Sequence, residues 1–154
     1  MEAKEGVRLI GQVIVEELVP GTDIVLSREV GENIICKKGA DMLATVLQSG
    51  AGAVSYNYMI MSSGNTPVAR ATLAIEAVRN QSSVIVPTLA ITGTTSIVTW
   101  VNTFAAGTGA TATWKFGMES AASGGELFNE YLFLVAKDNW NNDLKLTYNV
   151  SIAP

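Results

Sequence analysis

The segment 144–152 constrains the fold most, because apolar and polar side chains alternate strictly along it. Its apolar positions are Leu144, Leu146, Tyr148, Val150 and Ile152, and its polar positions are Lys145, Thr147, Asn149 and Ser151. A period of two is typical of a β-strand that has one face on a core and the other face in solvent. The segment therefore predicts a half-buried strand of an antiparallel sheet.

Two earlier segments, 97–104 and 112–118, alternate in the same way, and the second places Lys115 on its polar face. The loop 105–109 between them contains two glycines, which predicts that the two segments form a β-hairpin. Residues 131–135 are apolar on both faces, a pattern that predicts a central buried strand.

Shorter β-branched or aromatic runs predict further strands at residues 7–15, 24–26, 33–36, 56–61, 84–86 and 88–91. Pro87 interrupts the last two runs and predicts an edge strand or a bulge there. Residues 39–49 have apolar side chains at helical spacing and a glycine just after them, which predicts the one short helix. Residues 69–79 have helical propensity, and a short turn or an irregular strand fits them almost as well.

Together these segments predict a mainly β fold, an antiparallel β-sandwich or barrel with one short helix at about 39–49. The 154 residues are enough for one ordinary domain with a single core. We expect residues 21–154 to form this single β-rich domain. Residues 1–20 are expected to form an extended N-terminal arm or a swapped strand.

Charge is distributed unevenly along the chain. Residues 1–41 hold eight acidic and five basic residues, whereas no charged residue occurs from Asn80 to Trp114. The uncharged stretch contains many threonines and serines, so it predicts strands with a neutral, threonine-rich outer face. Because charged groups are depleted at the centres of protein interfaces, this stretch is expected to meet neighbouring subunits.

The composition excludes several classes of function. The chain has no histidine and a single cysteine, Cys36, so it lacks the commonest general base and the usual zinc ligand. We expect no cofactor, no metal and no enzymatic activity. The net charge of -4 argues against nucleic acid as a partner, and no run of about 20 apolar residues predicts a membrane span.

Three acidic or aromatic groups offer alternatives to a purely structural protein. Glu126 and Glu130, with Glu119, resemble a catalytic carboxylate pair, although we favour solvated or interface carboxylates. The loop 138–143 is dense in oxygen ligands, but it lacks the glycine and closing glutamate of a calcium loop, which favours a polar hairpin. Trp140 in this loop is expected to be exposed and available to a partner.

The acidic, β-branched N-terminal segment is the main candidate interface, because such an arm can add a strand to a neighbouring chain. The candidate interface residues are Val7, Leu9, Ile10, Val13, Ile14, Val15 and Trp140.

Two motifs of this sequence resemble motifs of small virion proteins of tailed bacteriophages. Thr72, Leu73, Glu76 and Arg79 follow a T-x-L-x-x-E-x-x-R pattern, and the strand from Asn129 to Phe133 follows an N-E-x-x-L-F-like pattern. Over residues 33–154 the order of segments is similar to that of capsid decoration proteins and of some tail-fibre or baseplate modules.

The resemblance implies a non-enzymatic capsid decoration, or cementing, protein made in the host cytoplasm and located on the capsid surface of the virion. Its implied partners are itself, as a homotrimer, and the major capsid protein. The alternatives are a tail-fibre or baseplate subunit, or a carbohydrate-binding or carbohydrate-cleaving β-sandwich that uses Trp140 with Glu126 or Glu130.

Overall fold

The computed structural model describes residues 8–35, 39, 56–69, 72, 74–121 and 125–154. These residues form nine strands, which are β1 (Arg8–Leu18), β2 (Val25–Ile35), β3 (Tyr58–Ser62), β4 (Val78–Gln81), β5 (Thr88–Thr92), β6 (Thr95–Phe104), β7 (Thr113–Glu119), β8 (Leu127–Lys137) and β9 (Asp143–Ala153). Every pairing between them is antiparallel. The predicted mainly β, antiparallel fold is confirmed.

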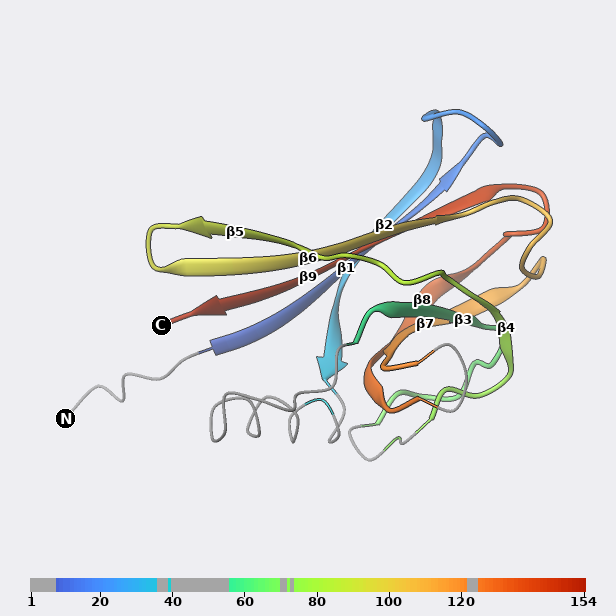
Figure 1. Ribbon diagram of the computed structural model, residues 1–154. Coiled ribbons are helices and arrows are strands. Elements are labelled where there is room, and N and C mark those ends of the chain that lie inside the picture. The colour runs from blue at the N-terminus through green and yellow to red at the C-terminus, as the bar shows by residue number, and fades with distance from the viewer. Residues whose placement is uncertain (1–7, 36–38, 40–55, 70–71, 73, 122–124) are drawn as a thin grey trace.

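The strands form two packed sheets in the continuous order β4-β3-β7-β8-β2-β1-β9-β6-β5. We call the strands β2, β1, β9, β6 and β5 sheet A, and the strands β4, β3, β7 and β8 sheet B. Strand β2 joins the two, because most of it pairs with β1 while Ile34 and Ile35 pair with β8. Figure 1 shows β1, β6 and β9 running together in one layer and β3, β7 and β8 in the other. The fold is therefore a sandwich, and its strand order does not close into a barrel.

The core lies between the sheets and is centred on β9. The alternating apolar side chains of residues 144–150 are at most 4% exposed, as the sequence pattern predicts. Among them, Tyr148 stacks on Trp100 with 5.6 Å between ring centroids and meets the edge of Phe116 at 5.8 Å. The rings of β6 and β9 thus pack against β7 from the opposite sheet, and this contact holds the two layers together.

The hairpin predicted around residues 105–109 is wrong. Strand β6 pairs with β5 and β9 in sheet A, while β7 pairs with β3 and β8 in sheet B. The connection crosses from one sheet to the other, and the buried Asn139 holds it in place. Its Nδ2 donates to the carbonyl of Phe104 at 3.0 Å, and its backbone N–H donates to the carbonyl of Ala110 at 3.0 Å. Turn residues alone do not distinguish a hairpin from such a crossover.

The buried strand predicted at residues 131–135 is only partly correct. Tyr131 and Phe133 belong to the core, whereas Leu134 and Val135 are 79% and 65% exposed. The register between β7 and β8 shifts beside these residues, so β8 bulges outward and turns two apolar side chains into solvent.

Three further predictions have different outcomes. The helix predicted at about 39–49 lies outside the described residues, apart from Gly39, which has helical geometry. In the segment 69–79, strand β4 begins at Val78, and the described residues before it are irregular. Pro87 directly precedes β5, which is the last strand of sheet A, so the predicted edge position is confirmed.

Gly31→Ala is expected to lower the free energy of unfolding by about 1–3 kcal/mol, because it overpacks a closed site. A Cβ on Gly31 would lie 2.2 Å from the hydroxyl oxygen of Tyr131, and that hydroxyl donates a 2.8 Å hydrogen bond to Glu29. Denaturant unfolding measures the change. The matched control is Val30→Thr on the opposite face of β2, which is expected to change stability by less than about 0.5 kcal/mol. Equal stability of Gly31→Ala and wild type would mean that the tyrosine ring can move aside.

Candidate binding surface

The side chains of sheet A that point away from sheet B form a broad exposed face. We call it face A, and it consists of Ile10, Gln12, Ile14, Val30, Ile97, Thr99, Val101, Thr147, Asn149 and Ser151. Ile10, Val30 and Val101 are between 43% and 47% exposed. Face A therefore spans four adjacent strands and presents apolar side chains from three of them, β2, β1 and β6, to solvent.

The cross-strand register arranges face A in three rows. The middle row is polar: Thr99 Oγ1 donates to Asn149 Oδ1 at 2.7 Å, and Asn149 Nδ2 donates to Gln12 Oε1 at 3.3 Å. The two flanking rows are mainly apolar and contain Val30, Ile14, Thr147 and Val101 on one side, and Ile10, Ser151 and Ile97 on the other. The side chains of the polar row hydrogen-bond to one another. A neutral partner can therefore cover this row while some of its polar groups keep their hydrogen bonds.

Charged residues border face A at one end and on the β2 side, and none lies within it. Glu16 pairs across the strands with Arg28 and with Lys145 at one end, and Glu32 lies beside Gln12 on the β2 side. A neutral centre inside a charged border is the usual anatomy of a protein interface. The outward side of β6 is neutral, as predicted for the uncharged stretch 80–114, and its face A residues are Ile97, Thr99 and Val101. The structure adds the polar side of β9 and the outward side of β1 to the same face.

The apolar residues predicted as an N-terminal interface do not share one environment. Val13 and Val15 are 0% exposed and belong to the core, and Leu9 packs against that core. Val7 lies outside the described residues. Strand β1 lies between β2 and β9, so Val13 and Val15 cannot contact a partner while β1 occupies its own sheet.

The other predicted interface residues are accessible. Ile10 and Ile14 lie on face A, and Trp140 is 56% exposed in the loop before β9, as expected. The described part of the segment 1–20 is a central strand of this chain's own sheet and not a projecting arm. Its exchange between copies stays a prediction.

The carboxylates around Trp140 bind the chain's own backbone. Asp138 accepts hydrogen bonds from the backbone of Trp140 and from both the backbone and side chain of Asn141, and the Asn141 bonds lower the pKa of Asp138. Asp143 accepts from the backbone N–H groups of Gly21 and Ala106, both at 2.9 Å. Both carboxylates thus fix loops. The predicted polar hairpin is nevertheless wrong, because the loop connects β8 of sheet B to β9 of sheet A and these two strands do not pair. Across the described part of the chain, no three His, Cys, Asp or Glu residues are grouped to hold a metal ion.

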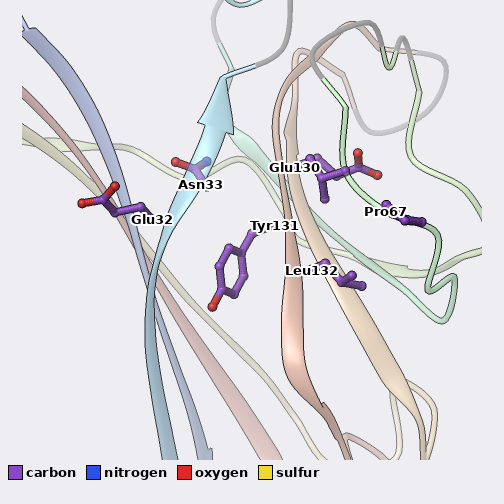
Figure 2. A pocket seen from close by; sticks show the side chains of 7 residues that line it. Glu32, Asn33, Pro67, Glu130, Tyr131 and Leu132 are labelled. Carbon is purple, nitrogen blue, oxygen red and sulfur yellow. The ribbon is translucent and has the colours of Figure 1, made fainter.

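A pocket of about 240 Å³ opens where β2 separates from β8. Its lining residues are Glu32, Asn33, Pro67, Val68, Glu130, Tyr131 and Leu132. Figure 2 shows the Glu130 side chain extending toward Pro67, while Tyr131 points to the other side of β8. The Oε2 of Glu130 and the amide of Asn33 have no partner, yet these atoms are buried and cannot touch a ligand directly. The pocket therefore offers few groups that would recognise a small molecule.

A buried ion-pair cluster lies beneath the segment between β3 and β4. Lys115 Nζ lies 2.8 Å from Glu76 Oε1, 3.1 Å from Glu130 Oε1 and 3.0 Å from Thr66 Oγ1. Lys115 and Glu130 are each 1% exposed. The expectation of solvated or interface carboxylates is therefore wrong for Glu130, which is buried in an ion pair with Lys115. Glu126 lies near Tyr56, with 3.4 Å between its Oε2 and the tyrosine hydroxyl.

Acid is expected to weaken the fold through Glu76. Hydrogen bonds from Lys115 and Thr66 lower the pKa of Glu76 from 4.5 to about 2. A carboxyl whose pKa is depressed by folding stabilises the protein fully above pH 4.5, and this contribution disappears as the pH falls toward 2. Denaturant unfolding across this range is expected to show a larger loss of stability for wild type than for Glu76→Gln.

Glu119→Gln is a control of opposite sign. Burial raises the pKa of Glu119, so its charged form costs stability as the pH rises through the folded-state pKa. This variant is expected to be more stable than wild type at neutral pH and to lose that advantage in acid. Parallel pH profiles for wild type and Glu76→Gln would contradict the role given to Glu76.

A second buried cluster holds the bulge of β8. Glu29 accepts hydrogen bonds from the hydroxyl of Tyr131 at 2.8 Å and from the backbone N–H of Leu134, and it lies 3.2 Å from Lys137 Nζ. Burial, followed by the bond to Glu29, raises the pKa of Tyr131. The bulge frees the Leu134 amide from the strand ladder, and the Glu29 carboxylate satisfies it.

Comparisons with known proteins identify no relative of this chain. No family model, no curated protein and no solved structure matches the chain. No helix among the described residues is long and apolar enough to cross a membrane. Face A is thus the candidate binding surface, on the strength of its own exposure and charge pattern.

Proposed function

We propose that this protein is a non-enzymatic structural component of a virus particle, a capsid decoration protein that binds the outside of the major capsid shell as a homo-oligomer. The observation that carries the proposal is face A, a neutral face of a β-sandwich with exposed Ile10, Val30 and Val101 at its surface. The virion setting comes from the resemblance of residues 33–154 to small phage virion proteins.

The shape of face A supports a large protein partner. It spans four strands of one sheet, with apolar rows on both sides of a polar row. Docking on a neutral surface does not remove water from charged side chains. The border charges stay available to set the orientation of the partner. When several copies of the chain are linked in one oligomer, weak contacts of this kind add through multivalency.

The distribution of carboxylates gives the carbohydrate alternative little support. Trp140 is exposed, as a sugar-stacking residue must be, but Glu130 is buried against Lys115 and cannot reach a sugar bound there. A tail-fibre or baseplate role would use the same kind of surface as a capsid role. The position of the protein in the particle separates the two.

Electron microscopy of purified particles, with the protein labelled by a specific antibody, tests the proposal. We expect label over the capsid shell. Shells that lack the protein are expected to disrupt at a lower temperature and to recover when the purified protein is added back. Label confined to the tail would establish the fibre or baseplate alternative. Particles without label would refute a virion role.

A further inference from the structure

Strand β5 is a free sheet edge. It is the last strand of sheet A, and all five residues from Thr88 to Thr92 are exposed. Leu89 and Ile91 are 63% and 70% exposed. Figure 1 shows β5 at the margin of its sheet, with β6 on its inner side. An edge of this kind presents unpaired backbone groups that can template another strand.

The register on β6 shows which backbone groups point outward. A two-residue turn at Gly93, whose φ is +59°, makes Thr92 and Thr95 the closing pair of the β5–β6 hairpin. In a hairpin with a two-residue turn the closing pair is hydrogen-bonded, and hydrogen-bonded pairs then alternate along the strands. The N–H and C=O groups of Ala90 therefore face β6. Those of Leu89 and Ile91 face outward.

Nothing in β5 protects this edge. Strand β4, the edge strand of sheet B, carries Arg79 and a register shift against β3, and both features discourage pairing with another chain. Strand β5 carries no charge and no proline, and its register on β6 runs without a shift. The flanking sequence is also neutral, because residues 80–114 contain no charged side chain.

We propose that β5 pairs antiparallel with β5 of a second copy, about a two-fold axis at Ala90. This register places Leu89 opposite Ile91 of the partner subunit, so the outward backbone groups of both residues are used on each side. Thr88 then faces Thr92 of the partner subunit, and the two Ala90 residues face each other. The strand reads Thr-Leu-Ala-Ile-Thr, so it is nearly the same in both directions.

The charge pattern favours a second copy over an unrelated partner. A two-fold contact brings the side chains at the axis close to their own copies, so a charge near the axis would lie close to a like charge. The absence of charge from residues 80–114 removes this repulsion. The contact lies on the edge of sheet A and not on face A, so it does not depend on the proposed function. A two-fold contact links copies in pairs, and the homotrimer implied by the resemblance would need another contact.

Sedimentation of the full chain as a function of concentration is the first test. The mass is expected to rise from 16.3 kDa toward twice that value. Ala90→Lys places two ammonium groups at the axis and is expected to raise the dissociation constant at least about tenfold. Leu134→Lys is the matched control, since it adds the same charge at an exposed apolar residue of sheet B, and it is expected to leave association unchanged.

Ile91→Pro removes an N–H that points away from β6 and is expected to give the same loss of association as a charge at the axis, whereas Ile91→Val is expected to keep it. Amide hydrogen exchange of wild type gives an independent readout. The amides of Leu89 and Ile91 are expected to exchange at least about tenfold more slowly at concentrations that favour the dimer, while the Ala90 amide stays protected throughout.

A chain that stays monomeric at all concentrations would overturn the proposal. Association that survives both Ala90→Lys and Ile91→Pro, or that yields three copies without a dimer, would overturn it as well. If β5 does not pair with a second copy, the proposed capsid role is unaffected, because antibody labelling of the particles tests that role separately.

Discussion

Replacing Lys115 with methionine is expected to lower the free energy of unfolding by about 3–5 kcal/mol, the usual cost of removing one partner from a buried ion pair. The Nζ of Lys115 lies 3.1 Å from Glu130, which is 1% exposed. The second carboxylate oxygen of Glu130 already has no hydrogen-bond partner. Without Lys115, the buried carboxylate would have no compensating cation. Denaturant unfolding at neutral pH measures the loss.

The double variant Lys115→Met/Glu130→Gln separates charge from packing. If the unpaired carboxylate causes the loss, removing its charge is expected to restore most of the stability. The matched control is Lys145→Met at the border of face A, which makes the same chemical change at a half-buried surface position and is expected to cost less than about 0.5 kcal/mol. A double variant as unstable as Lys115→Met would attribute the loss to packing and to the contacts of Lys115 with Thr66 and Glu76.

The Lys115 cluster also explains how the long connection between β3 and β4 stays on sheet B. Thr66 and Glu76 come from opposite ends of this connection, and both contact Lys115 on the outward side of β7. Glu76 accepts a further hydrogen bond from the backbone N–H of Thr66 at 3.0 Å. Loss of Lys115 is therefore expected to release the connection first, and its described amides would then exchange faster than those of β9.

The parts of the fold that the sequence predicts are those with a local signal. Strand β9 alternates strictly because one side packs on sheet B and the other forms face A, and each residue from 144 to 150 lies on the predicted side. The charge-free segment likewise indicates the neutral surface of β6. Both signals can be read within one segment of the chain, so no knowledge of distant contacts is needed.

The environment of Lys115 depends on distant residues and is not visible in the pattern. The alternation of residues 112–118 places Lys115 correctly on the side opposite Phe116, but that side is covered by the connection that carries Glu76. The same coverage buries Glu130, which the sequence suggested would be solvated or at an interface. A charged residue on the polar side of a strand is exposed only when no other segment covers it.

The misplaced interface residues have a simpler explanation. The β-branched pattern predicts one interface that contains Ile10, Val13, Ile14 and Val15, although neighbouring side chains of a strand point to opposite faces. A period of two separates Val13 and Val15 from Ile14, and the structure places the first two in the core and Ile14 on face A. The same rule places Thr147 on face A, because its two neighbours in the strand, Leu146 and Tyr148, point into the core.

Thr147→Glu is expected to weaken binding to capsid shells at least about 100-fold, because docking would strip water from a carboxylate placed in an apolar row of the contact. Thr147 lies between Ile14 and Val101 in an apolar row of face A, next to the border row that holds Glu16 and Lys145. The measurement is co-sedimentation of the purified variant with shells that lack the protein. The proposal of face A as the docking surface requires this loss to occur without unfolding.

Two controls make the result specific to face A. Leu134→Glu adds the same charge at a residue of sheet B that is 79% exposed, and it is expected to bind shells like wild type. Thr147→Ser keeps the position neutral and is expected to retain binding. Because Thr147 is half-buried at the surface, its glutamate variant is expected to keep the unfolding transition of wild type within about 1 kcal/mol. If Thr147→Glu is folded and still binds shells as wild type does, the docking surface lies elsewhere on the sandwich.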